Sequence, residues 1–307
     1  MKKLICVFVL VIISVFSLVS CKTDDYNKAL ELIEMGENEE AYELLKSVGF
    51  YKNAKKMLKD FYFVPTQIVG NRFVLEISYD ERHFPVKYIL DISDGKSVYT
   101  ADYEFDDNGF LIGQTESGFG KHVTKYFYNN EGLLDYAVTY DAYDKQFLEE
   151  TKYTYDDDGN LIEEDYGNTK RIYVYDRKGK LVKAFTTTDK TGAEEKVVTK
   201  YSYDSKGRLM EKTGDPLSRY DFSKYSYDSD GRLVKVTGRY VGEIETITSV
   251  YDDNDNLVEE IMVRPYYGEE RHVYIEYECI YAPNLPSKIK ERLDVNIWRE
   301  LSCWWNP

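Results

Sequence analysis

The sequence predicts a mainly β protein: an extended antiparallel sheet of repeated hairpins, twisted or spiralling, with a small α-helical cap at its N-terminus. Three observations predict this fold. A Tyr-x-Tyr-Asp-x-x-Gly-x-Leu motif recurs between residues 99 and 262, the segment before residue 62 spaces its apolar residues as a helix does, and 30 of the 307 residues are tyrosine. Tyrosine favours strands, and a motif that recurs every 20 to 28 residues indicates a repeat architecture.

The first twenty residues are predicted to be an export signal. Lys2 and Lys3 form a positive n-region, residues 4–15 form an apolar stretch too short for a membrane span, and Leu-Val-Ser-Cys21 follows. This ending resembles the lipobox of bacterial lipoproteins, which implies that Cys21 carries the lipid. The alternative is an ordinary signal peptide with a cysteine there by chance. We expect a protein of the bacterial cell envelope, lipid-anchored through Cys21 to the outer membrane or the cell surface.

Residues 26–62 have a helical period. Apolar residues recur at this spacing around Ala29, Ala41 and Ala54, and Gly36 and Gly49 stand where helices would end. The segment resembles about one and a half tetratricopeptide-type repeats. A single helical hairpin cannot bury its own apolar stripe. We therefore expect these helices to form a cap that packs on the start of the sheet or on a partner.

The repeat predicts hairpins of fixed register. Each aspartate begins a type I turn and each glycine takes the left-handed conformation at a bulge. The second tyrosine then faces the leucine across the hairpin, and such aromatic–aliphatic pairs stabilise sheets. The predicted turn residues are Asp156, Gly159, Asp176, Gly179, Asp204, Gly207, Asp228 and Gly231; the predicted packing residues are Tyr155, Leu161, Tyr175, Leu181, Tyr203, Leu209, Tyr227 and Leu233.

Seven copies of this motif resemble the YD repeats of rearrangement-hot-spot and teneurin-type proteins. In that family the repeats form a spiralling β-ribbon, so seven copies imply at most about one turn. Whether such a sheet closes is left open by the sequence. The expected organisation is a signal peptide at 1–20, a lipidated tether at 21–25, the helical cap at 26–62, the YD-repeat sheet at 63–280 and a C-terminal cap at 281–307.

Charge and cysteine content limit the function classes. The net charge of −15 and the scatter of Lys and Arg among carboxylates argue against a nucleic-acid partner, whose phosphates repel such a chain. Cys279 and Cys303 remain after Cys6 leaves with the signal and Cys21 takes the lipid. In an exported protein these two cysteines are expected to form a disulfide, with two buried thiols as the alternative.

No pattern in the sequence indicates catalysis or a cofactor. His83, His122 and His272 are isolated, without a second ligand at a metal spacing, and no nucleophile motif occurs. Clustered oxygens near Asp156 and Asp252 lack the glycine and glutamate of a calcium loop, so turn stabilisation explains them better. A carboxylate-based glycosidase is the weakest of the functions considered, because the repeat aspartates are already explained by turns. We expect no enzyme, no metal and no cofactor.

The tyrosines suggest binding. Most of them are expected to be packing units of the sheet, but aromatic rings also stack on sugars and are enriched at protein interfaces. Tyr266 and Tyr267, beside Pro265, are the candidate ligand-binding residues. The function we expect is non-catalytic binding of a glycan or a surface protein. The alternative is an envelope scaffold that binds no small ligand.

Overall fold

The computed structural model describes residues 22–92, 97–118, 120–188, 197–214, 220–240, 242–265 and 268–283. The chain divides into two compact units, one of residues 1–66 with 277–307 and one of residues 67–276. The boundaries fall inside the first and last strands, so both ends of the described chain belong to the first unit. The predicted C-terminal cap at 281–307 lies almost entirely outside the described residues.

The first unit is a helical cap packed on strand ends. It contains a helix over residues 22–35, α2 (Asn38–Val48), α3 (Ala54–Met57) and the 3₁₀ turn η1 (Leu58–Asp60). Gly36 and Gly49 end the first two helices with positive φ angles of 82° and 62°. Alanine and leucine side chains of the helices share one core with Phe61 and Cys279. The expectation that the helices pack on the start of the sheet is therefore confirmed, and the last strand joins the same core.

Eighteen strands follow in the described chain. They are β1 (Phe61–Gly70), β2 (Phe73–Tyr79), β3 (Pro85–Ile92), β4 (Ser97–Phe105), β5 (Leu111–Ser117), β6 (Lys121–Tyr128), β7 (Leu134–Asp141), β8 (Phe147–Tyr155), β9 (Leu161–Asp165), β10 (Thr169–Tyr175), β11 (Leu181–Thr188), β12 (Val197–Tyr203), β13 (Leu209–Thr213), β14 (Tyr220–Tyr227), β15 (Leu233–Tyr240), β16 (Glu243–Tyr251), β17 (Leu257–Arg264) and β18 (Glu269–Tyr281).

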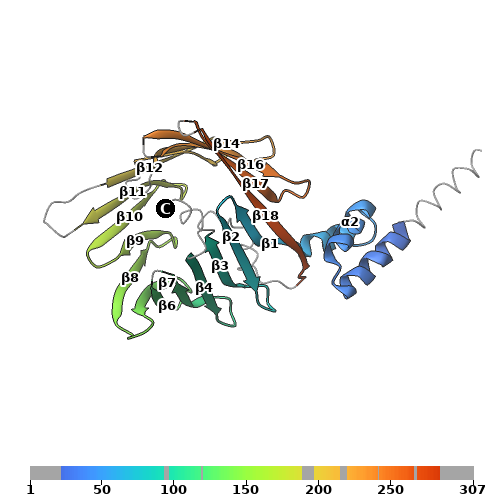
Figure 1. Cartoon of the computed structure of the whole chain (residues 1–307), viewed down its shortest axis with the longest axis horizontal. Helices are drawn as coiled ribbons and strands as arrows, with labels where there is room; N and C mark the ends of the chain where they lie inside the picture. The colour runs from blue at the N-terminus through green and yellow to red at the C-terminus, as the bar shows by residue number, and fades with distance from the viewer. Residues whose placement is uncertain are drawn as a thin grey trace, which may run out of the picture. The chain divides into compact units, whose positions relative to one another are not determined.

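The strands form a closed antiparallel barrel. Strands that follow one another in the chain pair along the curved sheet from β2 to β18, and β1 pairs with both β2 and β18 (Figure 1). The predicted mainly β, antiparallel fold is confirmed, but the strands close into a ring where a spiralling sheet was expected. Closure uses strands outside the seven motif copies, namely β1, β18 and the hairpin of β2 and β3. That hairpin contains a weaker motif copy whose turn begins at Asp80.

The predicted hairpin register is confirmed. Tyr155 pairs with Leu161, and the same pairing joins Tyr175 to Leu181, Tyr203 to Leu209 and Tyr227 to Leu233. Gly159, Gly179, Gly207 and Gly231 all have φ between 73° and 95°. The turn and the cross-strand pair therefore set the register together, as the motif predicts.

A second bulge in each motif hairpin was not predicted. Strict alternation along a strand would point the residue after each leucine to the opposite face. In the hairpin of β8 and β9, Tyr155 pairs with Leu161 but Thr154 pairs with Glu163, so Ile162 has no partner across the ladder. Hairpins with turns at Asp80, Asp106 and Asp252 show the same shift. Bulges increase the local twist of a strand, so their repetition favours the curvature that closure requires.

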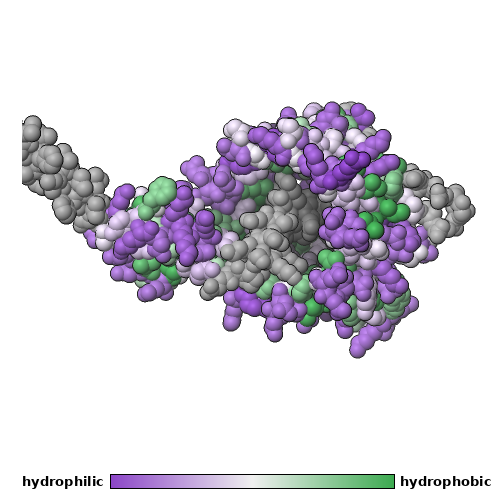
Figure 2. Space-filling view, turned by 180° about the vertical axis from the view of Figure 1, so that it is seen from behind, coloured by the Kyte–Doolittle hydropathy of each residue, from purple (hydrophilic) through white to green (hydrophobic). Residues whose placement is uncertain are grey.

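The two faces of the sheet differ in exposure. The tyrosine face, which carries both tyrosines of each motif, is half-buried or buried at most positions, whereas the opposite face is the more exposed. Exposed lysines of the opposite face include Lys125, Lys152, Lys200, Lys224 and Lys235. The surface is accordingly hydrophilic over most of its area, with apolar side chains gathered in small groups (Figure 2).

Candidate functional site: turn rim, tyrosine face and exposed aromatics

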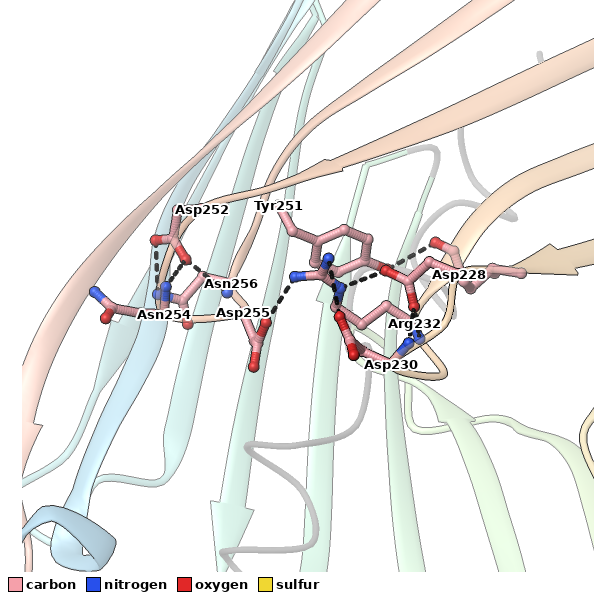
Figure 3. Close-up of polar contacts among 9 residues, drawn as sticks. Asp228, Asp230, Arg232, Tyr251, Asp252, Asn254, Asp255 and Asn256 are labelled. Atoms are coloured by element: carbon pink, nitrogen blue, oxygen red, sulfur yellow. Dashed lines mark hydrogen bonds and ion pairs between the residues drawn. The ribbon is translucent and has the colours of Figure 1, made fainter. Parts of the chain in front are cut away.

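The motif turns lie together at one end of the strands, because they form every second connection and successive connections of an antiparallel meander alternate between its two ends. We call them the turn rim; they begin at Asp80, Asp106, Asn129, Asp156, Asp176, Asp204, Asp228 and Asp252. At Asp228, one carboxylate oxygen accepts the N–H groups of Asp230 and Arg232, and the other accepts Nε of Arg232. The Asp252 carboxylate accepts N–H groups in the same way (Figure 3). These aspartates therefore stabilise turns, as the sequence predicts.

Hydrogen bonds keep the rim aspartates ionised. The side chain and backbone of Asn160 lower the pKa of Asp156, and the backbone N–H of Lys180 is the largest cause lowering the pKa of Asp176. The Arg232 side chain does the same for Asp228. Within the described ranges, no group of three or more His, Cys, Asp or Glu side chains is placed to hold a metal ion.

Adjacent hairpins are joined through the second tyrosine of each motif. The Tyr203 hydroxyl donates to the carbonyl oxygen of Leu181 at 2.7 Å, and Tyr227 donates to Leu209 at 2.8 Å. Tyr128, Tyr175 and Tyr251 repeat this contact with the leucine, or its equivalent, of the preceding hairpin. A tyrosine that packs in one hairpin therefore also satisfies a carbonyl of the hairpin before it. This contact was not predicted. Its sequence signal is that most copies have tyrosine rather than phenylalanine at the second aromatic position of the motif.

Cationic side chains cover several of these rings. Arg208 lies over Tyr227 with 4.6 Å from its guanidinium carbon to the ring centroid, and Arg232 lies over Tyr251 at 5.1 Å. Arg232 also reaches the next turn, where its Nη1 lies 2.7 Å from the Asp255 carboxylate (Figure 3). The turns that begin at Asp204 and Asp228 are thus each linked to the next hairpin by a stacked cation as well as by the phenol contact.

The tyrosine face carries a polar network around Glu164. Its carboxylate accepts the hydroxyls of Tyr166 at 2.8 Å and Tyr173 at 2.9 Å, and Arg171 lies 3.6 Å away. Burial is the largest cause that raises the pKa of Tyr153 and of Tyr173 to about 12, and it raises the pKa of Tyr166 as well. These phenols are therefore neutral hydrogen-bond donors at physiological pH.

A buried ion pair lies on the same face. Glu245 is 2% exposed and pairs with Nε of Arg264, which also lies 3.8 Å from Glu269. Burying a carboxylate is tolerated when a partner charge and hydrogen bonds compensate its lost hydration. This pair accounts for the charge inside the sheet without invoking a ligand.

Exposed aromatic residues gather at the connection between β7 and β8. Tyr143 is 81% exposed, Phe147 57% and Leu148 45%. The rings of Phe147 and Tyr140 meet edge to face, with centroids 6.3 Å apart. We call Tyr140, Tyr143, Phe147 and Leu148 the aromatic tip.

The backbone of the aromatic tip is held by its own hydrogen bonds. One Asp141 carboxylate oxygen accepts the N–H of Tyr143 at 2.8 Å and that of Asp144 at 3.3 Å. The N–H of Ala142 donates to the carbonyl oxygen of Lys121 at 2.8 Å, which ties the tip to the start of β6. The exposed rings are therefore presented on a fixed turn.

A hollow of about 430 Å³ lies on the opposite face at Gly113. Glu104 and Lys125 flank this glycine on the neighbouring strands, and a β-carbon at Gly113 would lie 3.1 Å from a Glu104 carboxylate oxygen. The missing side chain leaves the hollow. Acidic and basic groups are mixed around it and exposed, so its chemistry does not select one class of ligand.

The three histidines occupy different settings. His83 stands at the glycine position of the β2–β3 turn with φ 64°. His122 Nδ1 is buried without a hydrogen-bond partner. His272 lies on the opposite face with its two ring nitrogens 2.7 Å from Glu259 and 2.8 Å from Glu270, and these hydrogen bonds raise its pKa.

Several predicted residues lie outside the described ranges: Cys21, Tyr266, Tyr267 and Cys303. The lipidation site, the proposed binding tyrosines and the disulfide therefore stay predictions. Cys279 is buried in the core of the helical unit. Burial and the carboxylate of Glu39 raise the pKa of its thiol to about 12.

The helical unit bears a basic patch that sequence reasoning missed. Residues 46–59 contain no carboxylate and five lysines, all exposed: Lys46, Lys52, Lys55, Lys56 and Lys59. Phe50, within the same segment, is 82% exposed. The scatter of lysines among carboxylates assumed for the whole chain is therefore wrong for this segment. The signal was the run of lysines in this segment, which a count of charge over the whole acidic chain does not reveal.

No helix in the described part of the chain is both long and apolar enough to cross a bilayer.

Comparisons with known proteins give no family. No family model and no curated protein matches the chain. Among solved structures it is similar to TcdB2-TccC3 without the hypervariable C-terminal region, with TM-score 0.36 and 17% identity over 66% of this chain. This chain spans only 12% of that one.

Two smaller structures are also similar. A porin-like protein from Bacteroides uniformis has TM-score 0.36 and 12% identity, over 71% of this chain and 96% of that one. A DUF1329 family protein from Desulfovibrio piger has TM-score 0.24 and 10% identity, over 86% and 95%. At these TM-scores and identities, the similarities do not extend to function.

Proposed function

We propose that the protein is a lipid-anchored, YD-repeat protein of the bacterial cell envelope that binds a glycan without catalysis. The aromatic tip carries this proposal. Exposed apolar surface is unfavourable in water, and a tip that holds Tyr143 at 81% and Phe147 at 57% exposure is explained by a ligand that covers the rings. The N-terminal lipobox-like sequence supports the envelope location.

The chemistry of the tip favours a sugar. Sugars present apolar C–H faces that stack on aromatic rings and hydroxyls that bond to nearby polar groups. The carboxylate of Asp144 and the amide of Gln146 lie in the same turn as Tyr143, and each can bond to hydroxyls. The turn is fixed by the Asp141 hydrogen bonds, so little backbone entropy is lost on binding.

The repeat tyrosines support a scaffold role inside this protein more than a binding role. The hydroxyls of Tyr203 and Tyr227 are used by neighbouring hairpins, and their rings are half-buried. They build the sheet that positions the tip. An envelope scaffold without a ligand is the alternative function, and the tip would then be covered by a protein.

A glycan screen tests the proposal. The chain from Lys22 to Pro307 would be screened against bacterial, host and dietary glycans, including peptidoglycan fragments. Saturable binding should weaken at least about fivefold in Tyr143→Ala and in Phe147→Ala, since one aromatic contact contributes about 1 kcal/mol. Phe50→Ala removes an equally exposed ring from the helical unit and should leave glycan binding unchanged.

The outcomes separate the alternatives. Binding that survives both tip substitutions would place the glycan elsewhere and overturn the assignment to the tip. A folded protein that binds no glycan, but whose tip residues cross-link to a surface protein in intact cells, would establish the scaffold alternative. Lipidation is tested separately, by the mass of the mature N-terminal peptide and by loss of membrane association in Cys21→Ser.

A further inference from the structure

The basic patch on the helical unit is an unusual surface for this chain. Its five lysines extend over only fourteen residues of a protein whose net charge is −15. Lys46 lies 3.7 Å from Glu43, an exposed pair that neutralises little of the patch. Lys55 lies over the Phe50 ring at 4.5 Å and Lys52 over the ring of the adjacent Tyr51 at 5.4 Å, so these two charges lie beside the exposed aromatic segment.

The start of the described chain contacts this surface directly. The Thr23 hydroxyl lies 2.6 Å from the Tyr51 hydroxyl, and the rings of Tyr26 and Tyr51 meet edge to face at 5.8 Å. Lys52 lies over the Tyr26 ring at 4.6 Å. Cys21 is two residues before Thr23, and two extended residues reach about 7 Å. Whatever is attached to Cys21 is therefore tethered within about 7 Å of Thr23, whose hydroxyl meets that of Tyr51.

We propose that this patch docks on an anionic lipid bilayer, with Phe50 at the headgroup level and the lysines against the lipid phosphates. Aromatic and lysine side chains together are typical of surfaces that lie in the membrane interface. That the patch faces the membrane depends on the proposed lipidation of Cys21, whereas its preference for anionic lipids depends on the charge of its lysines.

The acidic remainder of the protein does not prevent this contact. Charges more than about 8 Å away are largely screened at physiological ionic strength. The segment that holds these lysines contains no carboxylate of its own. Each lysine near an anionic surface raises the binding constant about fivefold.

Lysine footprinting on the wild-type protein is the first test. The lipidated protein would be placed in vesicles with and without about 30% anionic lipid and treated with an amine-acylating reagent. Lys52, Lys55, Lys56 and Lys59 should be protected at least threefold in anionic vesicles relative to neutral ones. Lys178 and Lys206, exposed on the turn rim, are internal controls and should react equally in both.

Vesicle sedimentation of the chain from Lys22 to Pro307 is the second test, because it does not depend on lipidation. Binding to anionic vesicles should exceed binding to neutral ones and should fall at least tenfold in Lys55→Glu/Lys56→Glu. Lys178→Glu/Lys206→Glu makes the same charge change on the rim and should change binding less than twofold. Thermal melts of both variants check that each is folded.

Each outcome decides the proposal. Equal protection in neutral and anionic vesicles, or equal binding by the two double variants, would overturn it. If the Lys55/Lys56 variant does not fold, footprinting of the wild type still decides. An unlipidated Cys21 together with anionic-vesicle binding would refute the proposed anchor while supporting the patch.

Discussion

Replacing Gly159 by valine tests whether the repeat glycines are required for their backbone conformation. Gly159 has φ 81°, and a β-carbon there would meet nothing within 4 Å. Any loss of stability therefore comes from the left-handed backbone rather than from a clash. The left-handed region costs an L-residue about 1–2 kcal/mol, and a β-branched residue lies at the high end. Gly207 is less suitable, because a β-carbon there would lie 2.4 Å from Lys180 Nζ.

The expected loss for Gly159→Val is about 2 kcal/mol, or roughly 4–8 °C in Tm. Gly159→Asn should lose less, because asparagine tolerates this region. Asp157→Val is the matched control, since Asp157 is an exposed central turn residue without positive φ. The assay is thermal unfolding followed by circular dichroism. Equal losses for valine at 157 and at 159 would refute the assignment of the glycine to backbone strain.

Three further predictions follow from the same contacts. Asp255→Gly should stabilise the protein by up to about 1 kcal/mol, because Asp255 has φ 65° at a position where most motif copies have glycine. A drop in Tm would mean that the ion pair between Asp255 and Arg232 of the neighbouring turn stabilises more than the backbone strain costs. Tyr203→Phe should destabilise the protein by about 1 kcal/mol, because it removes the hydroxyl that donates to the carbonyl oxygen of Leu181, whereas Tyr225→Phe should cost less. If urea unfolding shows the larger loss for Tyr225→Phe, the tyrosine hydroxyl does not stabilise the contact between adjacent hairpins. His272→Gln should lower stability at low pH and match the wild type at high pH, because hydrogen bonds to two glutamates raise the histidine pKa above 6.5. The stability that the charged histidine contributes is complete below its unfolded-state pKa and is lost as pH rises through its folded-state pKa. A Tm difference between variant and wild type that grows with pH would refute this prediction.

The hairpins could be predicted because their determinants are local. The turn at Asp156, the positive φ of Gly159 and the pairing of Tyr155 with Leu161 all lie within seven residues. The second bulge was visible in the sequence as an apolar residue after the leucine in most copies, such as Ile162, but strict alternation was assumed there. A repeated break in alternation is thus itself a signal for a bulge.

Closure and the exposed surfaces depend on features that the motif does not contain. The ring closes through β1 and β18, which come from opposite ends of the described chain and carry no copy of the motif. Tyr143 lies in a connection without the motif, so its exposure could be found only once the strands were placed. The basic patch could be found only by counting charges within a short segment rather than over the whole chain.

The closed ring constrains how this protein can change by duplication. In an open array, a duplicated hairpin adds to one end and disturbs only its neighbour. Here a duplicated hairpin would add two strands to a circle, and barrel diameter grows with strand number. Every remaining strand would then adjust its tilt and twist, including those joined by the tyrosine hydroxyls. Unequal crossing-over, which readily lengthens tandem repeats, should therefore produce misfolded products here, and drift of sequence within a fixed number of hairpins becomes the easier route of divergence.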